Sequence, residues 1–179
     1  MKRFLTFSVM LAPTAALAHS GHDIGGFVGL LHPLTGADHL LAMLGVGLWA
    51  AQQSRNRLAL PLTFLIAMAA GFAAASLGVS LPAVEPLILA SVILLGAATA
   101  MTLRAPLAVA MPLVALFGLA HGAAHGSEGA GPTFALGMLA TTAALHIAGA
   151  AFGLTLNCRI MRLAGGATLI AGLGLAFAG

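Results

Sequence analysis

Six long apolar stretches, separated by short connections, constrain this chain more than any other feature of its sequence. A transmembrane helix needs about 20 consecutive apolar residues, and each stretch is close to that length. The chain of 179 residues is 60% hydrophobic and 6% charged, whereas soluble domains carry about 25% charged residues. We therefore predict an all-α polytopic membrane protein, a bundle of six transmembrane helices at about residues 26–51, 58–77, 86–103, 107–126, 133–156 and 160–177.

The N-terminal segment has the pattern of a secretory signal peptide. Two basic residues precede an apolar run, which ends in the small-residue sequence Ala-Leu-Ala at Ala18. We predict a cleavable signal peptide over residues 1–18 and one six-helix transmembrane domain over residues 19–179. Cleavage would leave His19 as the new N-terminus, on the outer side of the membrane.

Basic residues lie in alternate connections of the predicted mature chain. The connections after the first, third and fifth stretches carry all of them: Arg55, Arg57, Arg104, Arg159 and Arg162. Cytoplasmic loops of membrane proteins are enriched in Lys and Arg, so these connections should face the cytoplasm and both mature termini the periplasm. The same distribution indicates membrane orientation and not nucleic-acid binding.

The first apolar stretch holds three ionisable residues, His32, Asp38 and His39. Such residues are costly inside a membrane and usually mark ion pathways. In a straight helix the α-carbons of His32 and His39 would be about 10.5 Å apart, too far to share an ion easily. Pro33 and Gly36 predict a kinked or locally unwound helix, which could gather the three side chains around one metal ion. Alternatively, Asp38 orients one imidazole, or the group only caps the break and joins helices.

The fourth apolar stretch ends with a second group of residues that can bind metal. His121 and His125 are one helical turn apart and face the same way, and Glu128 can complete that face. Two imidazoles and a carboxylate suit nickel, cobalt, copper or zinc. The alternative is that both histidines pack inside the bundle and Glu128 is a solvated acid at its rim.

Four further residues are candidates with ordinary alternatives. Glu85 precedes the third stretch, as an acid favoured by the helix dipole or as a metal ligand that attracts cations. His146 lies deep in the fifth stretch, as a metal ligand or as an interhelical hydrogen-bond partner. His19 and His22 could chelate metal together with the new α-amino group, or belong to a flexible polar tail. Cys158 is the single cysteine, so no Cys-based zinc site can form.

Two motifs carry a resemblance to a known family. The run His32-Pro33-x-x-Gly36-x-Asp38-His39, the later run His-Gly-x-x-His-Gly-x-Glu that ends at Glu128, the signal peptide and the six spans together resemble the HupE/UreJ family. Members of that family are regarded as nickel or cobalt permeases, often encoded with hydrogenase or urease genes. The resemblance implies that the most important residues are His32, Asp38, His39, Glu85, His125 and Glu128, and His121 matches the family's His-Gly pattern.

The expected function is therefore a secondary permease of the bacterial inner membrane. Its transported substrate would be Ni²⁺ or Co²⁺, with no permanent cofactor, and its partners would be the lipid bilayer, further copies of itself in a homo-oligomer and, indirectly, urease or hydrogenase maturation. We do not expect an enzyme, and the sequence has no Walker motif to couple transport to nucleotide hydrolysis. The residues alone leave open an intramembrane zinc-dependent hydrolase, a b-haem protein and a non-transporting membrane accessory protein.

Overall fold

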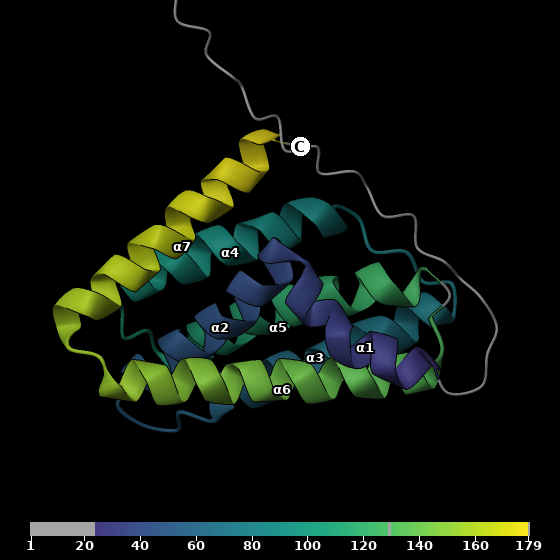
Figure 1. Cartoon of the computed structure of the whole chain (residues 1–179), viewed down its shortest axis with the longest axis horizontal. Helices are drawn as coiled ribbons and strands as arrows, with labels where there is room; N and C mark the ends of the chain where they lie inside the picture. Colours follow the sequence, from purple (N-terminus) through teal and green to yellow (C-terminus); the bar gives the residue numbers. More distant parts are fainter. Residues whose placement is uncertain (1–23, 129, 179) are drawn as a thin grey trace, which may run out of the picture.

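The computed structural model describes residues 24–128 and 130–178, and all its regular elements are α-helices (Figure 1). The all-α fold expected from the sequence is confirmed. The predicted signal peptide, His19 and His22 lie outside the described residues. The helices are α1 (Ile24–Thr35), α2 (Ala37–Gln52), α3 (Ala59–Ser76), α4 (Val84–Ala100), α5 (Leu107–Gly126), α6 (Pro132–Thr155) and α7 (Cys158–Ala178).

The first predicted helix, residues 26–51, is in fact two helices. The axes of α1 and α2 differ by 80°, and Gly36 lies between them in an extended conformation, with φ of −96° and ψ of 124°. Pro33 lacks a backbone N–H and is disfavoured inside a helix, so it destabilises the helix just before Gly36. The kink expected from Pro33 and Gly36 is confirmed, and it places α1 against α6.

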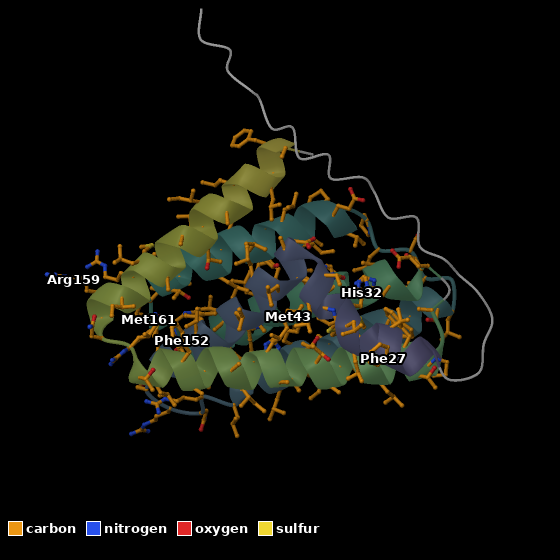
Figure 2. The ribbon with its side chains drawn as sticks, viewed as in Figure 1. Phe27, His32, Met43, Phe152, Arg159 and Met161 are labelled. Atoms are coloured by element: carbon orange, nitrogen blue, oxygen red, sulfur yellow. The ribbon has the colours of Figure 1, made fainter. Side chains whose placement is uncertain are left out.

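Several helices have the length and composition of membrane spans. These are α3, α5, α6 and α7, and the bent pair α1–α2 makes a fifth if it is one broken span. The remaining helix, α4, is apolar but shorter, with 17 residues. Membrane-spanning helices are therefore supported, while the number six stays a prediction. Met43 is buried inside the bundle, whereas Phe27 and Phe152 are exposed, as expected where lipid covers apolar side chains (all three are labelled in Figure 2).

Helix α2 occupies the centre of the bundle (Figure 1). It contacts α1, α3, α4, α6 and α7, and its side chains Met43, Val46 and Trp49 belong to the main hydrophobic core. The indole Nε1 of Trp49 donates a hydrogen bond to the carbonyl oxygen of Leu103 at 2.8 Å. This packing holds the first turn of α2, which carries His39, in a defined position inside the protein.

Glycines bring α5 directly against α3. Gly118, Gly122 and Gly126 are four residues apart, and a methyl group added to any of them would lie within 2.5 Å of an α3 backbone oxygen. Small residues allow membrane helices to approach this closely. His121 and His125 precede two of these glycines and lie on the adjoining face, where both rings are close to that of His39 of α2. Each His-Gly pair thus combines a packing residue with a residue that can bind metal.

The substitution Gly122→Ala should lower the stability of the bundle. The added Cβ would lie 1.9 Å from the carbonyl oxygen of Met68, so the helices would have to separate, and overpacking costs about 1–3 kcal/mol. Thermal unfolding in detergent should show a lower Tm than that of the wild type. The control is Gly166→Ala in α7, where nothing lies within 4 Å of the new Cβ. Equal Tm values for the two variants would contradict the prediction.

Candidate metal centre

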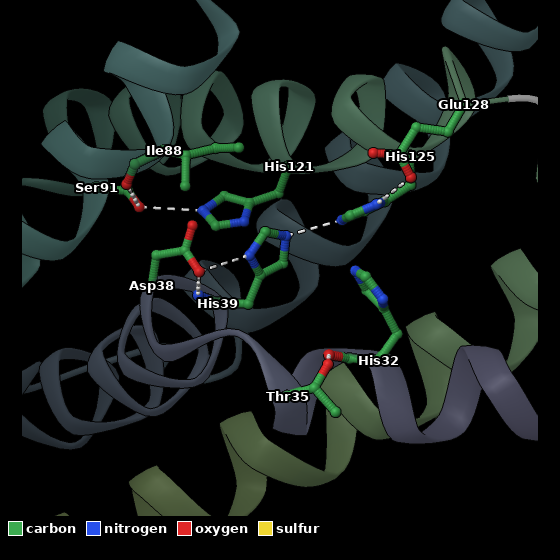
Figure 3. Close-up of polar contacts among 9 residues, drawn as sticks. All are labelled: His32, Thr35, Asp38, His39, Ile88, Ser91, His121, His125 and Glu128. Atoms are coloured by element: carbon green, nitrogen blue, oxygen red, sulfur yellow. Dashed lines mark hydrogen bonds and ion pairs between the residues drawn. The ribbon is translucent and has the colours of Figure 1, made fainter. Parts of the chain in front are cut away.

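Three imidazoles from three helices meet at one place, where Figure 3 shows them pointing toward one another: His32 of α1, His39 of α2 and His125 of α5. One ring nitrogen of each lies within 4.8 Å of the other two. We call these residues the three-histidine group. His39 and His125 are buried and His32 is partly exposed, so the group is open to its surroundings at His32.

The break at Gly36 is what brings His32 into the group. The rings of His32 and His39 have centroids 5.8 Å apart, although a straight helix would separate the two α-carbons by about 10.5 Å. Helix α6 holds α1 in this position. The hydroxyl of Thr141 donates to the carbonyl oxygen of Leu30 at 2.7 Å, and the ring of Phe134 lies 5.4 Å from that of His32.

Two carboxylates orient the imidazoles of the group. Asp38 Oδ1 accepts the backbone N–H of His39 at 2.9 Å and lies 3.2 Å from Nδ1 of the same residue. Glu128 Oε2 lies 3.5 Å from Nδ1 of His125. Because a carboxylate only accepts, it favours the tautomer with the proton on Nδ1, which leaves Nε2 free to bind a metal. Asp38 therefore has the orienting position, one of the three roles that the sequence left open.

The free nitrogens of His39 and His125 face each other, with Nε2 atoms 2.8 Å apart (Figure 3). A proton on one Nε2 would make this contact an N–H···N hydrogen bond. If both Nδ1 atoms carry the protons instead, two lone pairs meet here, and a bound metal ion would relieve their repulsion. Metal–imidazole bonds of about 2.0–2.1 Å at a right angle would place two nitrogens about 2.9 Å apart. The observed spacing therefore suits two neighbouring ligands of one divalent ion, with His32 as a third ligand.

His121 lies behind the three-histidine group and is completely buried, with its ring centroid 4.7 Å from that of His39. The hydroxyl of Ser91 donates to the carbonyl oxygen of Ile88 at 2.6 Å. The Ser91 oxygen is therefore left to accept from Nε2 of His121, 3.1 Å away. Nδ1 of His121 is then unprotonated, and it has no hydrogen-bond partner within the described part of the chain. It is a further nitrogen available to a metal ion.

The structure brings most of the predicted site residues together. Glu85 is separate from them: it is exposed in the first turn of α4 and makes no hydrogen bond or ion pair with other described residues. That position fits a helix-end acid and equally an acid that attracts cations. His146 lies elsewhere in the bundle, with Nδ1 2.8 Å from the carbonyl oxygen of Met43. The residues that gather are His32, Asp38, His39, His121, His125 and Glu128.

Sequence reasoning missed two residues that shape the site. Ser91 fixes the ring of His121. In the sequence, the only indication of this role was that Ser91 is a single hydroxyl residue within an aliphatic stretch. Phe134 packs near the rings of both His32 and His125, at centroid distances of 5.4 and 6.0 Å. An aromatic residue in an apolar helix gives no sign of its neighbours, so that contact could not be found from the sequence.

Comparison with known proteins agrees with the resemblance. The chain matches the family described as HupE / UreJ protein over residues 7–177. It is 37% identical over 183 residues to Protein HupE of Rhizobium leguminosarum bv. viciae, in an alignment that covers 95% of this chain and 94% of the relative. No solved structure matches it. Because the family match extends over nearly the whole sequence, this chain belongs to the HupE / UreJ family.

Proposed function

We propose that this protein is a secondary permease that carries a divalent transition metal ion, nickel or cobalt, across the bacterial inner membrane. The observation that carries the proposal is the three-histidine group, with ring nitrogens within 4.8 Å of one another inside a bundle of apolar helices. Imidazole is a suitable ligand for both metals. Membership of the HupE / UreJ family supports nickel or cobalt as the transported ion and hydrogenase or urease as its destination.

The ion would reach the group from the side where His32 is partly exposed. Glu128 is exposed beside His125, and Glu85 is exposed at the start of α4, so both can attract a cation. His32 would be the first nitrogen to replace a water ligand, and the buried His39 and His125 would follow.

Charge compensation at the site should permit both binding and release. A bare divalent ion in a dry interior is strongly disfavoured unless negative groups are near. Asp38 and Glu128 supply two negative charges through the imidazoles that they orient, without contributing to the three-histidine group themselves. Neutral nitrogen ligands backed by carboxylates can hold the ion with moderate affinity, which conduction requires.

We propose inward movement, from the periplasm to the cytoplasm, on the predicted orientation. With the Arg-bearing connections in the cytoplasm, the predicted cytoplasmic end of α5 is Leu107 and its periplasmic end is Gly126, next to the candidate centre. Inward movement of a divalent cation would be favoured by about 4.6 kcal/mol per 100 mV of membrane potential. The potential, a gradient or capture of the ion in the cytoplasm would drive transport.

The substitution His39→Ala should abolish most metal uptake, because it removes the buried nitrogen 2.8 Å from that of His125. We expect a loss of at least about 10–100-fold, the range known for partners that only orient a ligand. Cells would be assayed for radioactive nickel uptake, with Co²⁺, Zn²⁺ and Cu²⁺ as competitors and with membrane abundance measured in parallel. Ser127→Ala, an exposed change at the same rim, is the matched control.

Uptake by the His39→Ala variant equal to that of the wild type would refute the proposed site. Purified wild-type protein that retains stoichiometric zinc and cannot exchange it would instead favour the hydrolase alternative. A wild-type protein that reaches the membrane but transports none of the four metals would favour the accessory-protein alternative.

The substitution Asp38→Asn should weaken metal binding about 10–100-fold, because a neutral amide no longer supports the charge that builds up on His39 when it binds a cation. Isothermal titration of the purified protein with Ni²⁺ would measure the change. Glu128→Gln is the comparison: its carboxylate is more exposed and lies 3.5 Å from its histidine, against 3.2 Å for Asp38, so we expect a smaller loss. An Asp38→Asn variant that binds Ni²⁺ as tightly as the wild type would exclude the orienting role.

A further inference from the structure

A second buried histidine has an unused ring nitrogen, away from the three-histidine group. His146 of α6 is 1% exposed, and its Nδ1 lies 2.8 Å from the carbonyl oxygen of Met43. A carbonyl only accepts, so Nδ1 carries the proton and Nε2 is unprotonated. This Nε2 has no hydrogen-bond partner among the described residues. A buried polar atom without a partner is unusual and calls for an explanation.

Thr142 adds a second unpartnered atom on the same face of α6. It lies one turn before His146, is completely buried, and its Oγ1 also lacks a partner among the described residues. A threonine hydroxyl inside a helix usually donates to the carbonyl four residues earlier. An imidazole nitrogen is a ligand that suits nickel and related divalent ions, and a hydroxyl oxygen one turn away on the same helix can add a weaker one.

One aromatic ring lies next to both His121 and His146. The centroid of Phe64 is 5.5 Å from that of His121 and 5.1 Å from that of His146, and Phe64 is completely buried. His121 in turn lies 4.7 Å from His39. Successive ring contacts therefore connect the candidate metal centre to His146, and Phe64 is the one member of the series without a ligand atom.

The series runs from the rim of the bundle toward its interior. His121 is in the last turns of α5, next to the rim that we assign to the periplasm, whereas the Phe64 backbone packs against Gly118, about one turn further from that rim. His146 also borders a cavity of about 530 Å³ whose lining includes Arg57 and Ala150. On the predicted orientation, His146 lies closer to the cytoplasm than the three-histidine group.

We propose that His146 and Thr142 form an inner, transient binding site for the transported ion, and that the Phe64 ring must move aside for the ion to reach it. The inference rests on the proposed transport function. One imidazole and one hydroxyl bind more weakly than three imidazoles, which favours release on the inner side. The site would also explain why two polar atoms remain unpaired at the centre of an apolar bundle.

The test uses vesicles that contain the purified protein and a nickel-sensitive dye, with Ni²⁺ added outside. His146→Asn is the main variant, because an asparagine amide can still donate to Met43 while the Nε2 ligand is lost. We expect the maximal rate of nickel influx to fall by about tenfold or more, equivalent to about 1.4 kcal/mol in the barrier. Calorimetry should find that the nickel affinity of the three-histidine group differs from the wild-type value by less than about twofold. This change is much smaller than the tenfold fall expected in the influx rate, since a tenfold change corresponds to about 1.4 kcal/mol.

A matched pair of threonine variants separates the inner site from a general packing effect. Thr142→Val should slow influx severalfold. Thr168→Val removes another buried hydroxyl, which already donates to Ala164 in α7, and should leave influx unchanged. Phe64→Leu should raise the influx rate, because a smaller side chain obstructs the passage less, and it serves as the second test if His146→Asn does not fold.

Each outcome distinguishes the inner site from the proposed function. Wild-type vesicles that take up nickel at the same rate as His146→Asn vesicles would overturn the inner site and leave the permease proposal intact. A parallel loss of nickel affinity or of Tm in His146→Asn would show that His146 only packs the bundle. Wild-type vesicles that take up no nickel would refute the proposed function, and the inner site with it.

Discussion

Each unpaired backbone polar group in a bilayer costs several kcal/mol, so the helix break at Gly36 must be compensated by the groups around it. The hydroxyl of Thr35 donates to the carbonyl oxygen of His32 at 2.8 Å, and Asp38 accepts the backbone N–H of His39. The N–H of Leu40 donates to the carbonyl oxygen of Gly36 at 3.0 Å. The residues that repair the break thus include two of the three histidines and the carboxylate that orients one of them. The segment around Gly36 therefore both satisfies the backbone groups at the helix break and positions the histidines of the candidate metal site.

In helix α5, neighbouring residues have different roles: the glycines pack against α3, and the histidines face the candidate metal site. Gly122 and Gly126 permit contact with the α3 backbone at distances that no larger side chain would tolerate. The histidines before them lie on the adjoining face, toward α2. A change at either glycine should therefore move an imidazole as well as loosen the bundle. The motif His-Gly-x-x-His-Gly is accordingly a structural unit and not only a set of ligands.

The sequence predicted the positions of the helices and the kink, but not the arrangement of helices around the site. Pro33 and Gly36 act on their own backbone, so their effect can be foreseen. The 80° turn of α1 onto α6 and the partnership of Ser91 with His121 depend on contacts between distant segments. Helices that are apolar on all sides give no indication of which face meets which neighbour. For the same reason the location of Phe64 beside two histidines was not foreseen.

The contrast in burial among the three histidines has a mechanical consequence. His39 and His125 belong to helices held within the core, whereas His32 is on a short helix that is joined to α2 through Gly36 and docked on α6. A small rotation of α1 would withdraw one nitrogen and leave the other two in place. If the site holds an ion, such a rotation would reduce the number of its histidine ligands from three to two without any rearrangement of the core.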